Sequence, residues 1–192
     1  MAAVLGRNGA GKTTFIRCIA DLIPHQGSIV LEEDGKKLDR SSIAYLPQLE
    51  KITSSLTTFE TILLGLTKKL SWKVSEAQLA KVSQVIRELK LDTFANTSVR
   101  SLSGGQKQLV FLAQSFVSEP KLLLLDEPTS ALDVRHQLVV METVHRYCKK
   151  RNAIALYVIH DLMLASRFSD AVLFLHCLLY TSPSPRDPKT SR

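Results

Sequence analysis

The sequence predicts an α/β fold in which a parallel β-sheet carries helices on both faces. Two apolar segments, residues 2–5 and 122–125, show no alternation of polar and apolar positions. That pattern is typical of strands buried on both faces of a parallel sheet. Stretches with helical spacing separate the strand segments, as crossovers between parallel strands require. A chain of 192 residues can bury one such core with a subdomain, but not two full-sized domains.

The expected elements alternate along the chain and are bounded by turn residues. Short apolar runs predict strands at residues 2–5, 27–32, 43–46, 122–125, 154–159 and 171–175. Helices are predicted at residues 12–22 and 131–149, and a helical signal also covers residues 56–117. Within that region Ser75 and Gln78 form a capping-box pattern, and one apolar face is formed by Leu79, Val82, Ile86 and Leu89. We therefore expect a helical subdomain of about residues 52–117.

The composition argues against several classes of protein. No apolar run approaches the roughly 18 to 20 residues of a membrane span, and the N-terminus lacks a signal-peptide pattern, so a cytosolic protein is expected. The net charge is +7, but the basic residues are scattered singly or in pairs, so no nucleic acid partner is expected. Cys18, Cys148 and Cys177 lie far apart, which indicates reduced thiols rather than disulfides or a zinc site.

The last sixteen residues differ in character from the rest of the chain. From Cys177 onward, apolar patterns give way to Pro, Ser, Thr and charged residues. Residues 177–187 closely resemble the translation of a sequencing-library adapter, so residues 177–192 are expected to be a non-native, disordered tail. The alternative is a natural Pro-rich disordered tail. In either case these residues contribute nothing to the predicted fold.

Residues 6–13 read GRNGAGKT and fit the phosphate-binding pattern G-x-x-x-x-G-K-[ST]. They follow a strand and open a helix, which disfavours the alternative of a glycine turn with an incidental lysine. Backbone N–H groups and the helix N-terminus can surround phosphates here. Lys12 can neutralise phosphate oxygens while the Thr13 hydroxyl coordinates Mg²⁺. The predicted nucleotide contacts are Gly6, Asn8, Gly9, Ala10, Gly11, Lys12, Thr13 and Thr14.

Two further motifs add catalytic and anion-binding groups. The apolar segment LLLLDEP delivers Asp126 to a strand end, where it can contact a metal, and Glu127 can orient or deprotonate an attacking water. The alternative is a solvated acidic strand end. In LSGGQ, Ser103 and Gln106 also satisfy a helix capping box, but a cap needs neither Gly104 nor Gly105. Bare backbone at a helix N-terminus is a second anion site, which suggests one nucleotide shared between two chains.

The order of these motifs resembles the nucleotide-binding domain of ATP-binding cassette (ABC) proteins, so residues 1–176 are expected to form that domain. The matches are residues 6–13 for Walker A, Gln48 for the Q-loop, residues 102–106 for the signature, residues 122–127 for Walker B, residues 130–133 for the D-loop with Asp133, and His160 for the switch histidine. The resemblance implies that Glu127, His160 and Gln48 are catalytic and that Thr13, Gln48 and Asp126 contact the metal.

The resemblance also implies partners and a location. ATP and Mg²⁺ would be the ligands, and Ser103, Gly104, Gly105 and Gln106 would contact the ATP of a second ATP-binding subunit in a head-to-tail dimer. Transmembrane permease subunits, and indirectly a substrate-binding protein, would place the chain on the cytoplasmic face of the membrane. The segment TSALDVRHQL at residues 129–138 is most similar to importers of iron-siderophore, haem and cobalamin chelates.

Alternatives within the same family remain at this point. A soluble ABC ATPase of DNA repair or chromosome maintenance would need a long coiled coil between Gln48 and Leu102, and that interval shows no sustained heptads. A translation-type ATPase, a subunit for another substrate, or a non-hydrolysing subunit is also possible in principle, although all the catalytic residue types are present. Relatives carry a β-rich segment with an adenine-stacking aromatic before Walker A, so a chain truncated at both ends is expected to be inactive alone.

Overall fold

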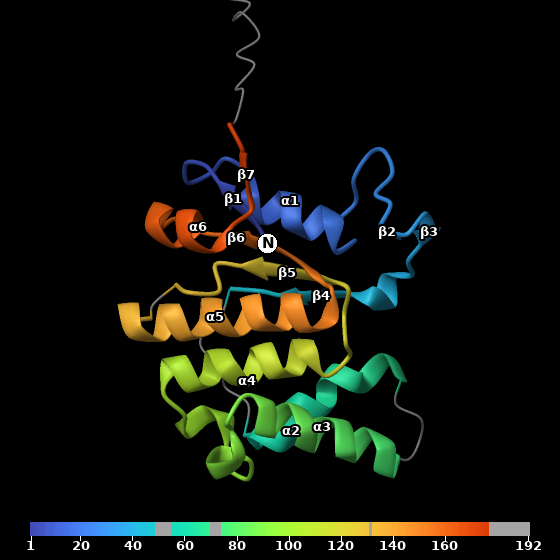
Figure 1. Cartoon of the computed structure of the whole chain (residues 1–192), viewed down its shortest axis with the longest axis vertical. Coiled ribbons are helices and arrows are strands. Elements are labelled where there is room, and N and C mark those ends of the chain that lie inside the picture. The colour runs from blue at the N-terminus through green and yellow to red at the C-terminus, as the bar shows by residue number, and fades with distance from the viewer. Residues whose placement is uncertain (49–54, 70–73, 131, 177–192) are drawn as a thin grey trace, which may run out of the picture.

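The computed structural model describes residues 1–48, 55–69, 74–130 and 132–176. Its centre is a five-stranded, fully parallel sheet with the strand order β4-β5-β6-β1-β7 (Figure 1). The strands are β1 (Ala2–Leu5), β4 (Ile43–Leu46), β5 (Leu122–Asp126), β6 (Ile154–Val158) and β7 (Ala171–Phe174). The parallel sheet that the sequence predicts is therefore confirmed.

Each central strand buries both of its faces. Leu122 and Leu124 of β5 pack with Ile16 of α1 (Lys12–Ile19) on one face of the sheet. Leu123 and Leu125 pack on the other face against α5 (Val134–Arg151), α6 (Leu162–Phe168) and α4 (Gly104–Phe116). Figure 1 shows α1 on one side of the sheet and α5 and α4 in successive layers on the other. Burial on both sides explains why β5 has no polar alternation.

The helical region forms a second core. It contains α2 (Thr58–Leu63), η2 (Leu64–Lys69), α3 (Glu76–Glu88), η3 (Asp92–Phe94), η4 (Val99–Ser101) and the whole of α4. Ile62, Val82 and Ile86 pack in it against Val110 of α4. The predicted capping box at the start of α3 is present, because the Gln78 N–H donates to Ser75 Oγ at 3.3 Å and the Ser75 N–H donates to Gln78 Oε1 at 2.8 Å. α4 contributes to both cores and so joins the helices to the sheet.

Three sequence predictions about local structure are wrong. The strand expected at residues 27–32 is replaced by a two-residue antiparallel pair, β2 (Glu32–Glu33) with β3 (Lys36–Lys37), because Ile29 and Val30 are exposed and pair with no strand in the described part of the chain. The helix expected over residues 12–22 ends at Ile19, shortly before Asp21 adopts a positive φ of 57°. Of the predicted apolar face of α3, Val82, Ile86 and Leu89 pack against the core as expected, but Leu79 is 39% exposed.

The two cysteines in the described part of the chain carry free thiols. Cys148 is buried, and burial raises its pKa to about 11, while Cys18 is partly exposed. Both are free, as the sequence predicts, and Cys177 lies outside the described residues. The predicted adapter-like tail also lies outside them. No helix in the described ranges is long and apolar enough to cross a bilayer.

Candidate functional site

The predicted catalytic residues gather at the carboxyl ends of the parallel strands. The loop after β1 leads into α1, and Gln48 follows β4. Asp126 ends β5 and Glu127 comes directly after it, while His160 follows β6. Asp126 lies opposite Val158 in the register of β5 and β6, so the residues just beyond them emerge side by side. Ligands of open parallel sheets bind at this edge.

The glycine-rich loop holds Lys12 in a buried position. Gly9 and Gly11 have φ angles of 81° and 87°, a left-handed conformation that side chains with a Cβ rarely adopt. Lys12 is 6% exposed, and its ammonium donates hydrogen bonds to the carbonyls of Gly6 at 2.9 Å and Arg7 at 3.0 Å. Because both partners are neutral acceptors, the positive charge at the start of α1 stays available to an anion.

A cavity of about 560 Å³ opens beside this loop. It is lined by Asn8, Gly9, Gly11, Lys12, Thr13, Thr14, Glu127 and His160. Six predicted nucleotide contacts and two predicted catalytic residues therefore share one cavity. Gly6 and Ala10 do not line it: the Gly6 carbonyl accepts the Lys12 bond, and the Ala10 N–H donates to the Arg7 carbonyl at 3.1 Å.

Asp126 is the most enclosed acidic group of the site. It is 2% exposed, and its Oδ1 accepts a hydrogen bond from the Thr13 hydroxyl at 2.9 Å. Its Oδ2 accepts a bond from the Tyr45 hydroxyl at 3.3 Å, and that hydroxyl accepts one from Arg17 Nε at 3.3 Å. Burial raises the pKa of the Tyr45 hydroxyl, although Arg17 has the opposite effect. The raised pKa keeps the hydroxyl protonated, so Tyr45 remains a donor. Carboxylate and hydroxyl oxygens side by side are suitable ligands for a hard cation.

Glu127 connects the other two predicted catalytic residues. Its Oε1 lies 2.8 Å from His160 Nε2, and its Oε2 accepts a hydrogen bond from Gln48 Nε2 at 2.9 Å. Its φ angle is 50°, an uncommon conformation for a residue with a Cβ that turns the chain immediately after β5. The structure thus brings Glu127, Gln48 and His160 into direct contact at the rim of the phosphate cavity.

The signature residues lie at the start of α4 and do not line the phosphate cavity of their own chain. Ser103 is the N-cap, with its Oγ accepting from the Gln106 N–H at 3.3 Å and its N–H donating to Gln106 Oε1 at 2.9 Å. Ser103 and Gln106 therefore form the helix capping box that their sequence pattern indicates. Asp133 is the N-cap of α5 and likewise does not line the cavity.

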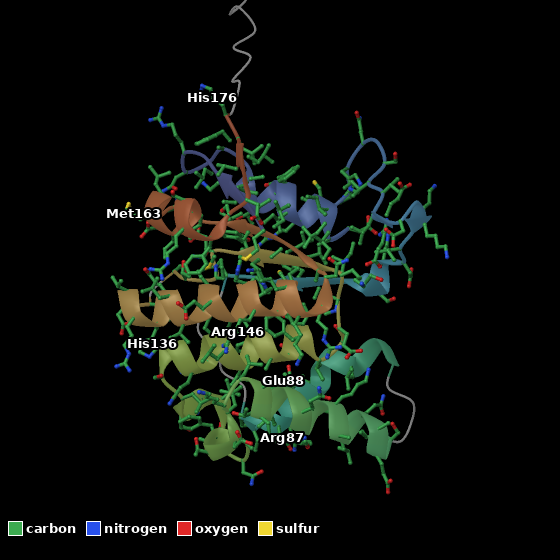
Figure 2. The ribbon with its side chains drawn as sticks, in the orientation of Figure 1. Arg87, Glu88, His136, Arg146, Met163 and His176 are labelled. Atoms are coloured by element: carbon green, nitrogen blue, oxygen red, sulfur yellow. The ribbon has the colours of Figure 1, made fainter. Side chains whose placement is uncertain are left out.

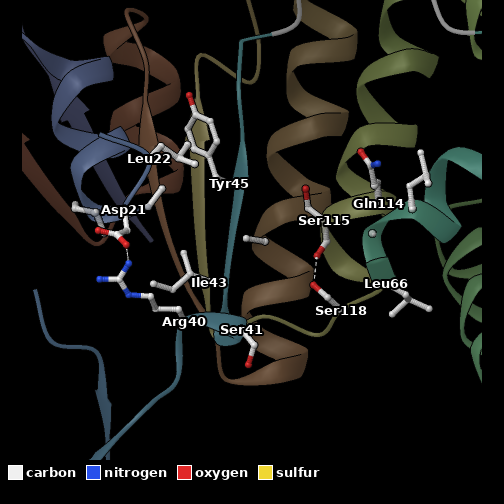
Figure 3. Close-up of a pocket in the computed structure, with 15 residues that line it drawn as sticks. Asp21, Leu22, Arg40, Ser41, Ile43, Tyr45, Leu66, Gln114, Ser115 and Ser118 are labelled. Atoms are coloured by element: carbon white, nitrogen blue, oxygen red, sulfur yellow. Dashed lines mark hydrogen bonds and ion pairs between the residues drawn. The ribbon is translucent and has the colours of Figure 1, made fainter. Parts of the chain in front are cut away.

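A second cavity of about 570 Å³ was not predicted from the sequence. It lies between the end of α1, β4, η2 and α4 (Figure 3). Arg40 and Asp21 form an ion pair at its wall. Tyr45 also lines it, so one side chain borders this cavity and contacts the Asp126 carboxylate. None of the predicted site residues lines it, and no motif marks it in the sequence.

Comparison with known proteins gives a consistent assignment. The ABC transporter family model matches residues 1–130. An uncharacterized ABC transporter ATP-binding protein of Methanocaldococcus jannaschii is 38% identical over 181 residues, which is 91% of this chain and 71% of that protein. The achromobactin transport ATP-binding protein of Dickeya dadantii is 32% identical, over 92% of this chain and 68% of that protein.

Solved structures show the same relationship. An inward-facing putative metal-chelate type ABC transporter superposes with a TM-score of 0.82 at 30% identity, covering 92% of this chain and 68% of that one. A dimeric ATP-binding cassette bound to ADP and Pi in a post-hydrolysis state superposes with a TM-score of 0.74 at 26% identity, covering 91% and 80%.

The fold and the phosphate loop define a nucleotide-binding protein of the P-loop class, with ATP as its ligand. The chain belongs to the ABC transporter family, among the ATP-binding subunits that hydrolyse ATP.

Proposed function

We propose that this chain binds MgATP in the 560 Å³ cavity and hydrolyses it with Glu127 as the residue that handles the water. The observation that carries the proposal is the contact of Glu127 with both Gln48 and His160 beside the cavity that Lys12 lines. Phosphoryl transfer needs positioning and charge neutralisation more than covalent chemistry. A carboxylate held from two sides at the cavity rim meets the need for a positioned base.

The loop and its flanking residues divide the binding of MgATP between them. Lys12 would exchange its bonds to the loop carbonyls for β- and γ-phosphate oxygens, and the N–H groups at the start of α1 would contact the same phosphates. Thr13 and Asp126 would hold Mg²⁺, with Gln48 as a further ligand. Mg²⁺ usually takes one or two protein carboxylates and completes its shell with phosphate oxygens and water. The ion would neutralise charge developing on the transferred phosphoryl group.

The three rim residues would complete the catalytic arrangement. Glu127 would accept a proton from, or orient, the attacking water, and His160 would hold the γ-phosphate. Gln48 bonds to Glu127 here and would report the γ-phosphate to a bound permease. Both Glu127 contacts come from neighbouring strand ends, so a shift of either loop would displace the carboxylate.

The signature residues support a shared site. Ser103, Gly104, Gly105 and Gln106 do not line their own chain's cavity, although α4 presents a glycine-rich N-terminus typical of anion sites. The related cassette bound to ADP and Pi is dimeric. We therefore propose a head-to-tail dimer in which each signature contacts the nucleotide of the other chain.

Replacing Ser103 with arginine is expected to lower ATP turnover at least tenfold while the chain's own ATP affinity stays within about twofold, because the bulk blocks only the partner's γ-phosphate. Mixing Ser103→Arg chains with Lys12→Ala chains should restore activity, since one of the two shared sites is then intact. If each variant alone behaves as wild type and mixing changes nothing, the shared-site proposal is wrong.

The transport role is proposed from named relatives. Two relatives are named as transport ATP-binding proteins, for achromobactin and, in Helicobacter pylori at 32% identity, probably for an iron chelatin. A third, of Mesorhizobium japonicum at 30% identity, is named a hemin import ATP-binding protein. We propose that this subunit works at the cytoplasmic face of the membrane, peripherally, beneath permease subunits and with a substrate-binding protein. Its cargo would be an iron chelate, haem or cobalamin.

Uptake measurements test this role. The subunit, expressed with its cognate permease, should support uptake of a labelled iron chelate, haem or cobalamin. Uptake should fall to background with Glu127→Gln, because import depends on hydrolysis. Transport of only sugars, amino acids or peptides would contradict the cargo assignment and leave the ATPase assignment intact.

A further inference from the structure

His136, in the first turn of α5, lies directly against the signature backbone. A methyl group on Gly105 would lie 2.4 Å from His136 Cδ2 and 2.8 Å from its Cγ. Carbon atoms do not approach each other so closely, so only glycine can occupy position 105 while the ring stays in place. Figure 2 shows His136 at the end of α5 that lies beside α4. Gly105 thus has a packing role within its own chain in addition to any role toward an anion.

The same histidine is bonded to the D-loop on its other side. His136 Nδ1 lies 2.8 Å from both carboxylate oxygens of Asp133, and the His136 backbone N–H donates to Asp133 Oδ1 at 2.9 Å. These bonds, the backbone one first and then that of the ring, hold the pKa of Asp133 below its usual value. An ionised carboxylate only accepts hydrogen bonds, so Nδ1 carries the proton.

A second contact, between Leu132 and Gly104, also joins the D-loop to the signature. Leu132, just before Asp133, places its Cδ2 3.6 Å from where a Cβ on Gly104 would be. Both signature glycines therefore face the segment that begins α5: Leu132 lies over Gly104, and His136 lies over Gly105. Two contacts fix the orientation of the signature relative to the start of α5, whereas a single contact would allow the two segments to rotate about it.

We infer that His136 is a positioning residue that couples the D-loop to the signature, so that both reach the partner chain's nucleotide as one unit. The inference rests on the proposed shared site. His136 does not line the phosphate cavity, so it acts through Gly105 and Asp133 and leaves the chain's own ATP binding unchanged. Its loss would misplace the signature relative to the D-loop and slow the hydrolysis that needs both.

Three substitutions separate the ring contact from the hydrogen bond. His136→Ala removes both, His136→Phe keeps a ring on Gly105 but cannot bond to Asp133, and His136→Asn keeps a short donor for Asp133. We expect His136→Ala and His136→Phe to lower kcat about tenfold with the ATP affinity within about twofold. His136→Asn loses the ring contact on Gly105 and should lower kcat by a similar factor, because the coupling needs both contacts. The Phe variant should keep the native melting temperature, because its ring still covers Gly105.

A matched control and two outcomes make the test decisive. His145→Ala removes another histidine of α5, whose ring contacts Phe168, and should leave kcat unchanged. Native kcat in the Phe variant, or kcat lost only in proportion to a fall in melting temperature, would overturn the inference. If the native subunit hydrolyses ATP and Glu127→Gln does not, that failure concerns His136 alone. A native subunit without hydrolysis would overturn the proposed function and this inference together.

Discussion

Replacing Glu127 with glutamine is expected to reduce ATP turnover by about 10²- to 10⁴-fold while ATP binding persists, since a positioned general base contributes a factor of that size. The amide keeps the size and planarity of the side chain that contacts Gln48 and His160. It cannot accept the proton of the attacking water. Because Lys12 and the phosphate loop are unchanged, ATP should remain bound and hold two chains together. Phosphate release, nucleotide affinity and dimer fraction measure the three effects.

A second glutamate provides the control for this substitution. Glu142 lies on α5 and is about half exposed, and among the described residues its one ion pair is a long one with Arg167 at 3.9 Å. Glu142→Gln should therefore leave turnover unchanged, because a solvent-exposed pair contributes little. Phosphate release at the native rate by Glu127→Gln would refute the assignment of Glu127.

The sheet and the phosphate site could be predicted because their signals are local. The alternate residues of β5 divide between two buried faces, so residues 122–125 are uniformly apolar in the sequence. The phosphate loop is a contiguous motif whose glycines need left-handed backbone. Parallel strands then bring Glu127 and His160 to one edge, although they are far apart in the chain.

The parts that could not be predicted depend on contacts between distant segments. The segment 27–32 has strand-like composition, but Ile29 and Val30 find no sheet neighbour among the described residues, so composition alone misleads. The contact of Tyr45 with Asp126 requires β4 and β5 to be adjacent, which the sequence order does not reveal. The need for glycine at position 105 arises from His136 on another helix.

The contacts of Lys12 predict a second large effect, a loss of ATP affinity when its ammonium is removed. Its ammonium is buried, lies at the start of α1 and is bonded only to the carbonyls of Gly6 and Arg7 among the hydrogen bonds of the described chain. These neutral partners hold the charge in position and can be exchanged for phosphate oxygens. Charge-assisted hydrogen bonds contribute about 1.5 to 3 kcal/mol each, so losing one or two to phosphate weakens binding by roughly 10- to 10⁴-fold.

Replacing Lys12 with alanine is therefore expected to weaken ATP affinity about a hundredfold and to abolish hydrolysis at ordinary ATP concentrations, whereas Glu127→Gln loses turnover alone. Titration calorimetry with ATP and a phosphate-release assay distinguish the two patterns. Lys149→Ala, at an exposed position in the last turn of α5, serves as the charge-matched control and should bind ATP normally. Native affinity in the Lys12 variant would show that phosphate recognition rests on the backbone N–H groups of the loop and not on the ammonium.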